Sequence, residues 1–198
     1  FYAVYEANEY TVKFTVDGNT VKEETIEYGQ KVMPPADPTA PTGKTFAGWS
    51  ADGTNLVDFN TYTVEQDVEF TPVFTDKATY TVTFMSDGAQ YTTATAIDGS
   101  PVAKPATDPT KTGYTFKFWS ETENGTEYDF ATPVTGAKTL YAVFEINKYT
   151  VKFMADGAEY DSKEVNYNAT VSAPATNPTK TGSTFKFWSA TENGTAYD

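Results

Sequence analysis

Short stretches of alternating apolar and polar residues recur along the chain, and the first of them shows the pattern. In Tyr10–Val16 every second residue is apolar or aromatic, and the residues between them are Thr, Lys and Thr. This is typical of a strand with one buried face. Asp17 and Gly18 separate it from a second β-branched run at Thr20–Tyr28. Because glycine accepts the positive φ that a two-residue turn needs, the arrangement predicts a β-hairpin.

A proline-rich stretch follows the hairpin and predicts a crossover rather than a long helix or a central strand. Residues 32–43 read VMPPADPTAPTG, and proline fixes φ and removes an amide donor. Two more strands are predicted at Thr45–Ser50 and Val68–Phe74, and the second is apolar on both faces, as in a strand inside a sheet. Between them, Leu56–Asn60 predicts one helical turn, with Asp58 or Asn60 as its cap.

The same series of elements occurs three times. The pattern Tyr-Thr-Val-x-Phe begins at Tyr10, Tyr80 and Tyr149, at spacings of 70 and 69 residues. Residues 111–129 and 180–198 differ at only three of 19 positions. Self-similarity at a fixed spacing indicates tandem duplication of one small structural unit.

The repeat boundaries give four segments. Residues 1–8 (FYAVYEAN) resemble residues 140–147 (LYAVFEIN) and are therefore predicted to be the last strand of a preceding repeat. Repeat 1 is 9–78, repeat 2 is 79–147, and repeat 3 is 148–198, truncated before its last strand. Four or five residues join the predicted strands of neighbouring repeats, so we expect joints with little slack and an elongated arrangement. The predicted fold class is mainly β or α+β with low helix content.

Composition excludes several kinds of chemistry. The 198 residues contain no Cys, no His and no Arg, and 27 Asp and Glu outnumber 14 Lys to give a net charge of -13. Without His or Cys, we expect no disulfide, no metal site, no cofactor, no histidine base and no thiol nucleophile. The acidic balance disfavours nucleic acid as a partner, and no apolar run is long enough for membrane insertion.

Carboxylate pairs are the remaining candidates for catalysis. Glu121 with Glu123, or Asp58 with Glu65, could be imagined as an acid and base for glycoside cleavage. Nothing in the sequence fixes their separation, and Glu121 is replaced by Ala190 in repeat 3. We therefore predict that the chain is not an enzyme.

The three tryptophans, Trp49, Trp119 and Trp188, allow two interpretations. In the favoured one, each indole is part of the core of its repeat. In the alternative, the indoles and the polar loops after them form a ligand-binding platform for a host or cell-wall glycan or protein, because aromatic faces stack on sugar rings and at interfaces. Weak sites in tandem would then gain affinity from avidity.

A family resemblance rests on the combined motifs. Tyr28-Gly29-Gln30-Lys31-Val32, the Gly43–Trp49 stretch GKTFAGW and the closing Tyr-Ala-Val-Phe resemble the Listeria–Bacteroides repeat family, the B-repeats of internalin-type bacterial surface proteins. Repeats 2 and 3 depart from the Gly-Trp pair, with Phe118 and Phe187 before their tryptophans. The resemblance implies a β-grasp-like (ubiquitin-like) fold, an extracellular location at the bacterial cell surface, and a non-catalytic stalk or spacer that supports adhesion or presents another domain.

The implied fold also leads to a hypothesis about self-association. In a β-grasp the last strand lies beside the first, in parallel, so Tyr149–Met154 of the truncated repeat 3 is expected to have an unpaired side. Phe1–Asn8 is the segment whose sequence matches the missing strand. The hypothesis is that this segment of another chain pairs head to tail with Tyr149–Met154, as in strand addition to an open edge.

Overall fold

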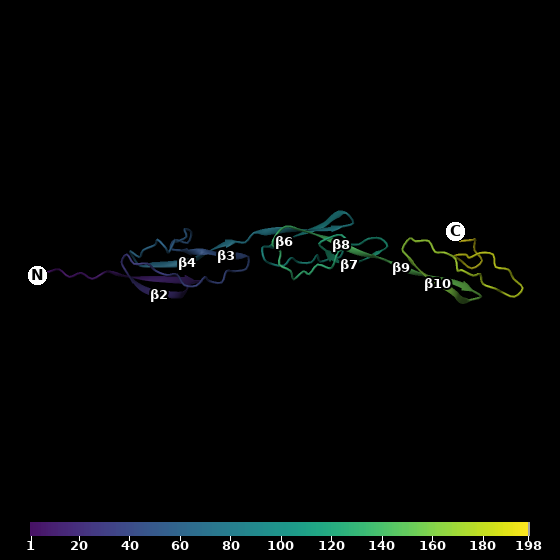
Figure 1. Ribbon diagram of the computed structural model, residues 1–198, viewed down its shortest axis with the longest axis horizontal. Helices are drawn as coiled ribbons and strands as arrows, with labels where there is room; N and C mark the ends of the chain where they lie inside the picture. Colours follow the sequence, from purple (N-terminus) through teal and green to yellow (C-terminus); the bar gives the residue numbers. More distant parts are fainter. Residues whose placement is uncertain (198) are drawn as a thin grey trace. The chain divides into compact units, whose positions relative to one another are not determined.

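The computed structural model describes residues 1–197, and these residues contain ten strands and no helix (Figure 1). By their contacts, residues 1–80, 96–100 and 133–136 form one compact unit, and the other described residues form a second. The strands make three separate sheets in chain order. The prediction of a mainly β fold with low helix content is confirmed.

The first sheet belongs to repeat 1 and has four strands in the order β2-β1-β4-β3. They are β1 (Glu9–Val16), β2 (Asn19–Glu27), β3 (Lys44–Ser50) and β4 (Val68–Asp76). β1 pairs antiparallel with β2 and parallel with β4, and β4 also pairs antiparallel with β3. The last strand therefore lies inside the sheet, as its apolar residues on both faces predicted.

The sheet of repeat 2 has the same order, β6-β5-β8-β7. Its strands are β5 (Thr79–Ser86), β6 (Ala89–Ile97), β7 (Tyr114–Ser120) and β8 (Lys138–Ile146). β5 again pairs in parallel with the last strand, from Val82 opposite Lys138 to Met85 opposite Tyr141. The expected parallel pairing of first and last strands is present in both repeats, while the β-grasp assignment itself stays a prediction.

Two-residue turns close the three hairpins. Asp17 and Gly18 have φ of 50° and 77°, and both Asp87-Gly88 and Asp156-Gly157 have nearly the same values. Positive φ at both central positions is the conformation whose twist matches that of paired strands, and Asp-Gly is a favoured sequence for it. The hairpin prediction is confirmed in all three repeats.

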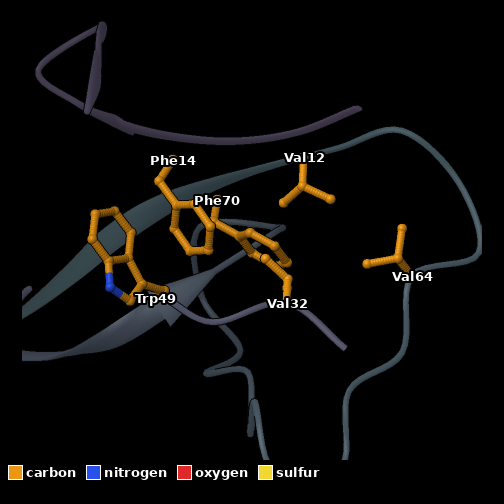
Figure 2. Close-up of a cluster of buried hydrophobic side chains, with 6 residues drawn as sticks. All are labelled: Val12, Phe14, Val32, Trp49, Val64 and Phe70. Atoms are coloured by element: carbon orange, nitrogen blue, oxygen red, sulfur yellow. The ribbon is translucent and has the colours of Figure 1, made fainter. Parts of the chain in front are cut away.

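The core of repeat 1 is a cluster of aromatic and β-branched side chains (Figure 2). The ring centroid of Phe14 lies 5.1 Å from that of Trp49 and 5.0 Å from that of Phe70. In Figure 2, Trp49 lies at one end of the cluster and Val64 at the other. Each such side chain contributes about 1.5–3 kcal/mol on burial, so the repeat can form a core without disulfides. The buried members are Val12, Phe14, Val32, Trp49, Val64 and Phe70.

Repeat 3 has only a hairpin, formed by β9 (Lys148–Ala155) and β10 (Ala158–Asn166). Within the described residues β9 pairs with β10 alone, so the expectation of an unpaired side is confirmed. Residues 184–189, which match β7, form no strand. In repeat 2 the partner of β7 is β8, and residues 148–197 contain no equivalent of β8.

Two details differ from the sequence-based expectations. The joints are shorter than predicted, with only Lys77 and Ala78 between β4 and β5, and only Asn147 between β8 and β9. The last strands continue to the joints because their final residues stay paired within their own repeats, Asp76 with Lys44 and Ile146 with Tyr114. The predicted helical turn is a single hydrogen-bonded turn, in which the amides of Thr61 and Tyr62 donate to the carbonyl of Asp58.

Candidate functional site

The tryptophans of repeats 1 and 2 lie in the cores of their repeats. Trp49 is 3% exposed and Trp119 is 0% exposed, whereas Trp188 is half-buried. Each indole packs against the phenylalanine of the first strand, and the pairs Phe14–Trp49, Phe84–Trp119 and Phe153–Trp188 have centroid distances of 5.1, 4.9 and 5.1 Å. No indole face is free for stacking in repeats 1 and 2. Ligand binding by the three tryptophans stays a prediction.

The indole nitrogens nevertheless share an unusual property. The Nε1 atoms of Trp49, Trp119 and Trp188 are buried and have no hydrogen-bond partner among the described residues. Buried indole N–H groups usually have one. The same polar group is thus unpaired at the equivalent place in every repeat.

A tyrosine and a threonine connect the hairpin to the crossover in repeats 2 and 3. The hydroxyl of Tyr91 donates to the carbonyl of Thr107 at 3.1 Å, and Tyr160 donates to Thr176 at 3.2 Å. The same tyrosines lie 5.9 and 5.8 Å from the rings of Trp119 and Trp188. Repeat 1 has Val21 at the equivalent position, so this contact belongs to two repeats only.

An open groove lies beside Tyr91 in repeat 2. Its volume is about 500 Å³, and its walls come from β6 and from the proline-rich crossover. Small and hydroxyl side chains dominate it, with one cation, Lys104. The lining includes Phe84, Tyr91, Thr92, Ala94, Ala103 and Thr107.

Two of the candidate carboxylates, Asp58 and Glu121, form local contacts. The backbone and side-chain amides of Asn60 donate to Asp58 and lower the pKa of that carboxyl. Glu121 forms an ion pair with Lys138. The lowered pKa of Asp58 is opposite to the raised pKa that a carboxyl group held protonated for acid catalysis requires.

The most strongly bonded carboxylate is that of Asp52, in the loop after Trp49. The side-chain amide and backbone amide of Asn55 each donate to it at 2.7 Å, and the amide of Thr54 donates at 2.8 Å. These bonds hold the pKa of Asp52 well below its usual value. The carboxylate therefore organises its own loop. No group of three or more candidate metal ligands occurs within residues 1–197.

The joints are a feature that sequence reasoning missed. At the joint between repeats 2 and 3, the amide of Asn147 donates to the carbonyl of Gly113 at 2.9 Å, and the carbonyl of Asn147 accepts from the amide of Tyr167 at 2.7 Å. One residue is thus bonded to both repeats. At the joint between repeats 1 and 2, Lys77 donates to Gly43 and Ala78 accepts from Asp98.

At the joint between repeats 2 and 3, a glycine leaves room for a tyrosine ring. Gly113 has a φ of +77°, and a Cβ atom there would lie 1.9 Å from Cδ1 of the Tyr167 ring. The ring therefore packs directly on the glycine backbone. The sequence did hold a sign of this joint, because a glycine ends the crossover of every repeat, at Gly43, Gly113 and Gly182. From the sequence alone these glycines were interpreted only as turn residues.

An open surface remains on repeat 3. Apolar side chains that are half-buried in repeat 2 are more exposed at the equivalent places in repeat 3, where Tyr149, Met154 and Phe187 are 50%, 52% and 48% exposed. Residues 1–8 form an extended segment without a strand partner (Figure 1). Tyr2, Val4 and Tyr5 in it are 99%, 92% and 90% exposed.

Tandem β repeats with this sheet order and these joints define a repeat array. The sequence model of the Listeria-Bacteroides repeat domain matches residues 10–71, 80–143 and 149–198. These matches cover most of the chain, and the chain belongs to the Listeria–Bacteroides repeat family. The resemblance seen in the motifs is confirmed.

Two similar proteins show where such repeats occur. The chain is 36% identical over 193 residues to a protein of Evansella cellulosilytica that is named as a Gly-rich membrane protein, covering 94% of this chain and 22% of that protein. It is 34% identical over 210 residues to internalin H of Listeria monocytogenes, covering 93% of this chain and 38% of internalin H. The chain thus spans well under half of each relative. Within residues 1–197 no helix is long and apolar enough to cross a membrane.

Proposed function

We propose that this chain is a non-catalytic spacer segment of a bacterial cell-surface protein, where it presents another domain and supports adhesion. Family membership and the names of the relatives support the surface location. The observation that carries the spacer role is the joint at Asn147, where a single residue between two strands is hydrogen-bonded on both sides.

A spacer holds another domain at a fixed distance only if the joints between its repeats resist bending. A flexible linker samples many orientations because its backbone dihedral angles are free. At Asn147 both backbone polar groups are bonded, and the Tyr167 ring packs on Gly113, which supports a restricted joint. The remaining chemistry agrees with this role, because the large side chains form cores and the charged groups are mostly exposed.

Joint stiffness can be measured by double electron–electron resonance, and the absence of native cysteine makes labelling specific. The pair Thr95→Cys and Ser162→Cys places one label on β6 and one on β10, both at exposed positions. We expect a distance distribution about as narrow as that of Thr95→Cys with Thr139→Cys, a reference pair within the sheet of repeat 2. A short Gly-Ser insertion between Asn147 and Lys148 should broaden only the first distribution.

The spacer proposal is wrong if the Thr95–Ser162 distance distribution is already as broad without the insertion as with it. In that case the hydrogen bonds of Asn147 do not restrict the neighbouring repeats. The reference pair is a control for local unfolding, because unfolding of repeat 2 would broaden both distributions.

A second candidate function is weak glycan or protein binding by each repeat. The observation that favours it is the open groove beside Tyr91, whose ring lies 5.9 Å from that of Trp119. The test is titration of the whole chain with cell-wall and host glycans, followed by tryptophan fluorescence and by amide chemical shifts of Thr92, Ala103 and Thr107. Saturable shifts confined to those residues would support binding, and their absence would leave the spacer role alone.

A further inference from the structure

Repeats 1 and 3 each hold a lysine ammonium group between the second hairpin strand and the proline-rich crossover. In repeat 1 the ammonium of Lys22 donates to the carbonyl of Met33 at 2.6 Å. In repeat 3 the ammonium of Lys163 donates to the carbonyls of Ser172 and Ala173 at 2.8 and 2.7 Å. Hydrogen bonds from a charged donor are stronger than neutral ones, so each lysine connects the two segments firmly.

An aromatic ring lies beneath each of these ammonium groups. The Nζ atom of Lys22 is 6.0 Å from the centroid of the Phe14 ring. In repeat 3, the Nζ atom of Lys163 is 5.9 Å from the centroid of the Phe153 ring. Both distances are within the range of cation–π attraction. The two phenylalanines occupy the same position in the first strands of their repeats, so a ring and crossover carbonyls form the same kind of ammonium site twice.

The two lysines reach this site from different positions of the strand. Lys22 corresponds to Asp161 of repeat 3, whereas Lys163 corresponds to Glu24 of repeat 1. In repeat 1 the carboxylate of Glu24 pairs with Lys22 at 2.8 Å. The ammonium site is thus the same although the lysine and the acidic residue exchange positions. The acceptor groups, rather than one strand position, define the site.

Repeat 2 has neither charge at these two positions. Thr92 and Ala94 occupy them, and both side chains are half-buried. They line the open groove of about 500 Å³ between β6 and the crossover. Phe84, which corresponds to Phe14, also lines the groove and is fully buried, as Phe14 is. The groove of repeat 2 therefore lies where the other two repeats place a lysine side chain.

The acceptor groups of the site remain in repeat 2. Ala103 corresponds to Met33 and to Ser172, and the next residue, Lys104, corresponds to Ala173. Both Ala103 and Lys104 line the groove. Within residues 1–197, no backbone amide donates to the carbonyl of either residue. Because an ammonium group has three donors, one that enters the groove can bond to both carbonyls.

The side chain of Lys104 lies over a different ring. Its Nζ atom is 5.6 Å from the centroid of Phe116, and it pairs with Asp108 at 3.4 Å. As a like charge beside the groove it opposes the entry of a cation. The chain as a whole carries a net charge of -13, which attracts cationic partners and accelerates their encounter with the chain.

We propose that the groove of repeat 2 binds a lysine side chain of a partner protein, whose ammonium group donates to the carbonyls of Ala103 and Lys104 as the chain's own lysines do in repeats 1 and 3. A lysine suits the groove because its apolar stem can lie along the wall while its ammonium group meets the carbonyls. The proposal rests on the second candidate function, to which it gives a ligand, and it does not depend on the spacer role.

The first test titrates the whole chain with a capped pentapeptide, acetyl-Thr-Val-Lys-Val-Thr-amide, and follows the amide chemical shifts. We expect saturable shifts confined to the groove, at Thr92, Ala94, Ala103 and Lys104. The same peptide with an Nε-acetylated lysine should bind at least about tenfold more weakly, because it lacks the charge and two of the three donors. Neutral glycans are titrated in parallel.

Two substitutions that copy the other repeats should close the groove. Ala94→Lys reproduces Lys163 of repeat 3. Thr92→Lys reproduces Lys22 of repeat 1. Each should weaken binding of the pentapeptide about tenfold or more, because the ammonium group of the new side chain occupies the carbonyls. The matched control is Thr95→Lys, which adds the same charge at an exposed position of β6 and should bind the peptide within about twofold of the parent chain.

A second test needs no partner. The carbonyl carbon resonances of Ala103 and Lys104, which respond to hydrogen bonding, should move in Ala94→Lys and stay unchanged in Thr95→Lys. In the peptide titration, Lys104→Ala should strengthen binding because it removes the like charge beside the groove. Lys117→Ala removes the same charge from β7 and should have a smaller effect.

Several results would overturn the proposal. If the acetylated peptide binds as tightly as the peptide with a free amine, or if only neutral glycans shift the groove amides, the second candidate function stands without this ligand. Equal weakening by Ala94→Lys and Thr95→Lys would indicate general charge repulsion, and unchanged carbonyl resonances in Ala94→Lys would show that the acceptors do not take an ammonium group. No saturable shift with any peptide or glycan would overturn the second candidate function as well.

Discussion

Substitution of Gly113 by alanine tests the joint between repeats 2 and 3. An L-residue at a φ of +77° costs about 1–2 kcal/mol. The new Cβ would also overlap the ring of Tyr167, at 1.9 Å from Cδ1, so the ring must leave its place. Losing part of the burial of one aromatic side chain adds about 1 kcal/mol. We therefore expect a local cost of about 2–3 kcal/mol, which corresponds to an equilibrium change of about 30- to 100-fold.

The assay is native-state hydrogen exchange, which reports opening at single amides. The amides to follow are those of Asn147 and Tyr167, which close the two hydrogen bonds of the joint. Their exchange should accelerate by about 30- to 100-fold in Gly113→Ala. The amides of Lys77 and Asp98, which close the other joint, should be unaffected.

Gly182→Ala is the matched control. Gly182 has a φ of +72° and open space where its Cβ would be, so the backbone cost is the same but no ring is displaced. Exchange at Asn147 and Tyr167 should not change. The reasoning is refuted if Gly113→Ala leaves these two amides within about twofold of the parent chain, or if Gly182→Ala accelerates them to the same extent.

Three further predictions concern single repeats. Trp119→Ala should lower the free energy of unfolding, measured with urea, by about 3–5 kcal/mol. Trp188→Ala should lower it less, because Trp188 is only half-buried. Equal losses in the two variants would contradict the assigned core positions. Asp52→Asn should lower the melting temperature of repeat 1 at pH 7. Since folding lowers the pKa of Asp52 from 3.8, its stabilisation is present above pH 3.8 and is lost as the pH falls through the folded value. The difference in melting temperature between the parent chain and Asp52→Asn should therefore shrink only below pH 3.8. A difference that is unchanged in strong acid would show that the ionised Asp52 carboxylate is not its cause. Asp87→Asn should preserve the hairpin, whereas Asp87→Val at a φ of 51° should cost about 1–2 kcal/mol by thermal unfolding.

Much of the fold followed from local patterns. Alternation in Tyr10–Val16 and the Asp17-Gly18 pair predicted the first hairpin, because side-chain period and turn conformation are properties of a few neighbouring residues. The apolar faces of Val68–Phe74 placed that strand inside a sheet. The helical turn predicted at Leu56–Asn60 forms only as the single turn that begins at Asp58.

The candidate site was harder to predict from sequence. Trp49, Trp119 and Trp188 looked equivalent, but the last is more exposed because its sheet is incomplete. The glycine at 113 indicated a turn, yet its contact with Tyr167 spans residues more than fifty positions apart. A pattern of neighbouring residues cannot indicate a contact between residues so far apart in the sequence.

The sequence by itself determined the number of repeats, their strands, their hairpin turns and the absence of cysteine and histidine chemistry. These depend on short-range periodicity, residue type and internal comparison. Only the tertiary structure decided that a single residue, Asn147, bonds to both of its neighbouring repeats. Backbone hydrogen bonds between distant strands have no residue-specific signature, because every residue except proline carries the same donor and acceptor. Whether they form is therefore settled by which strands meet in space.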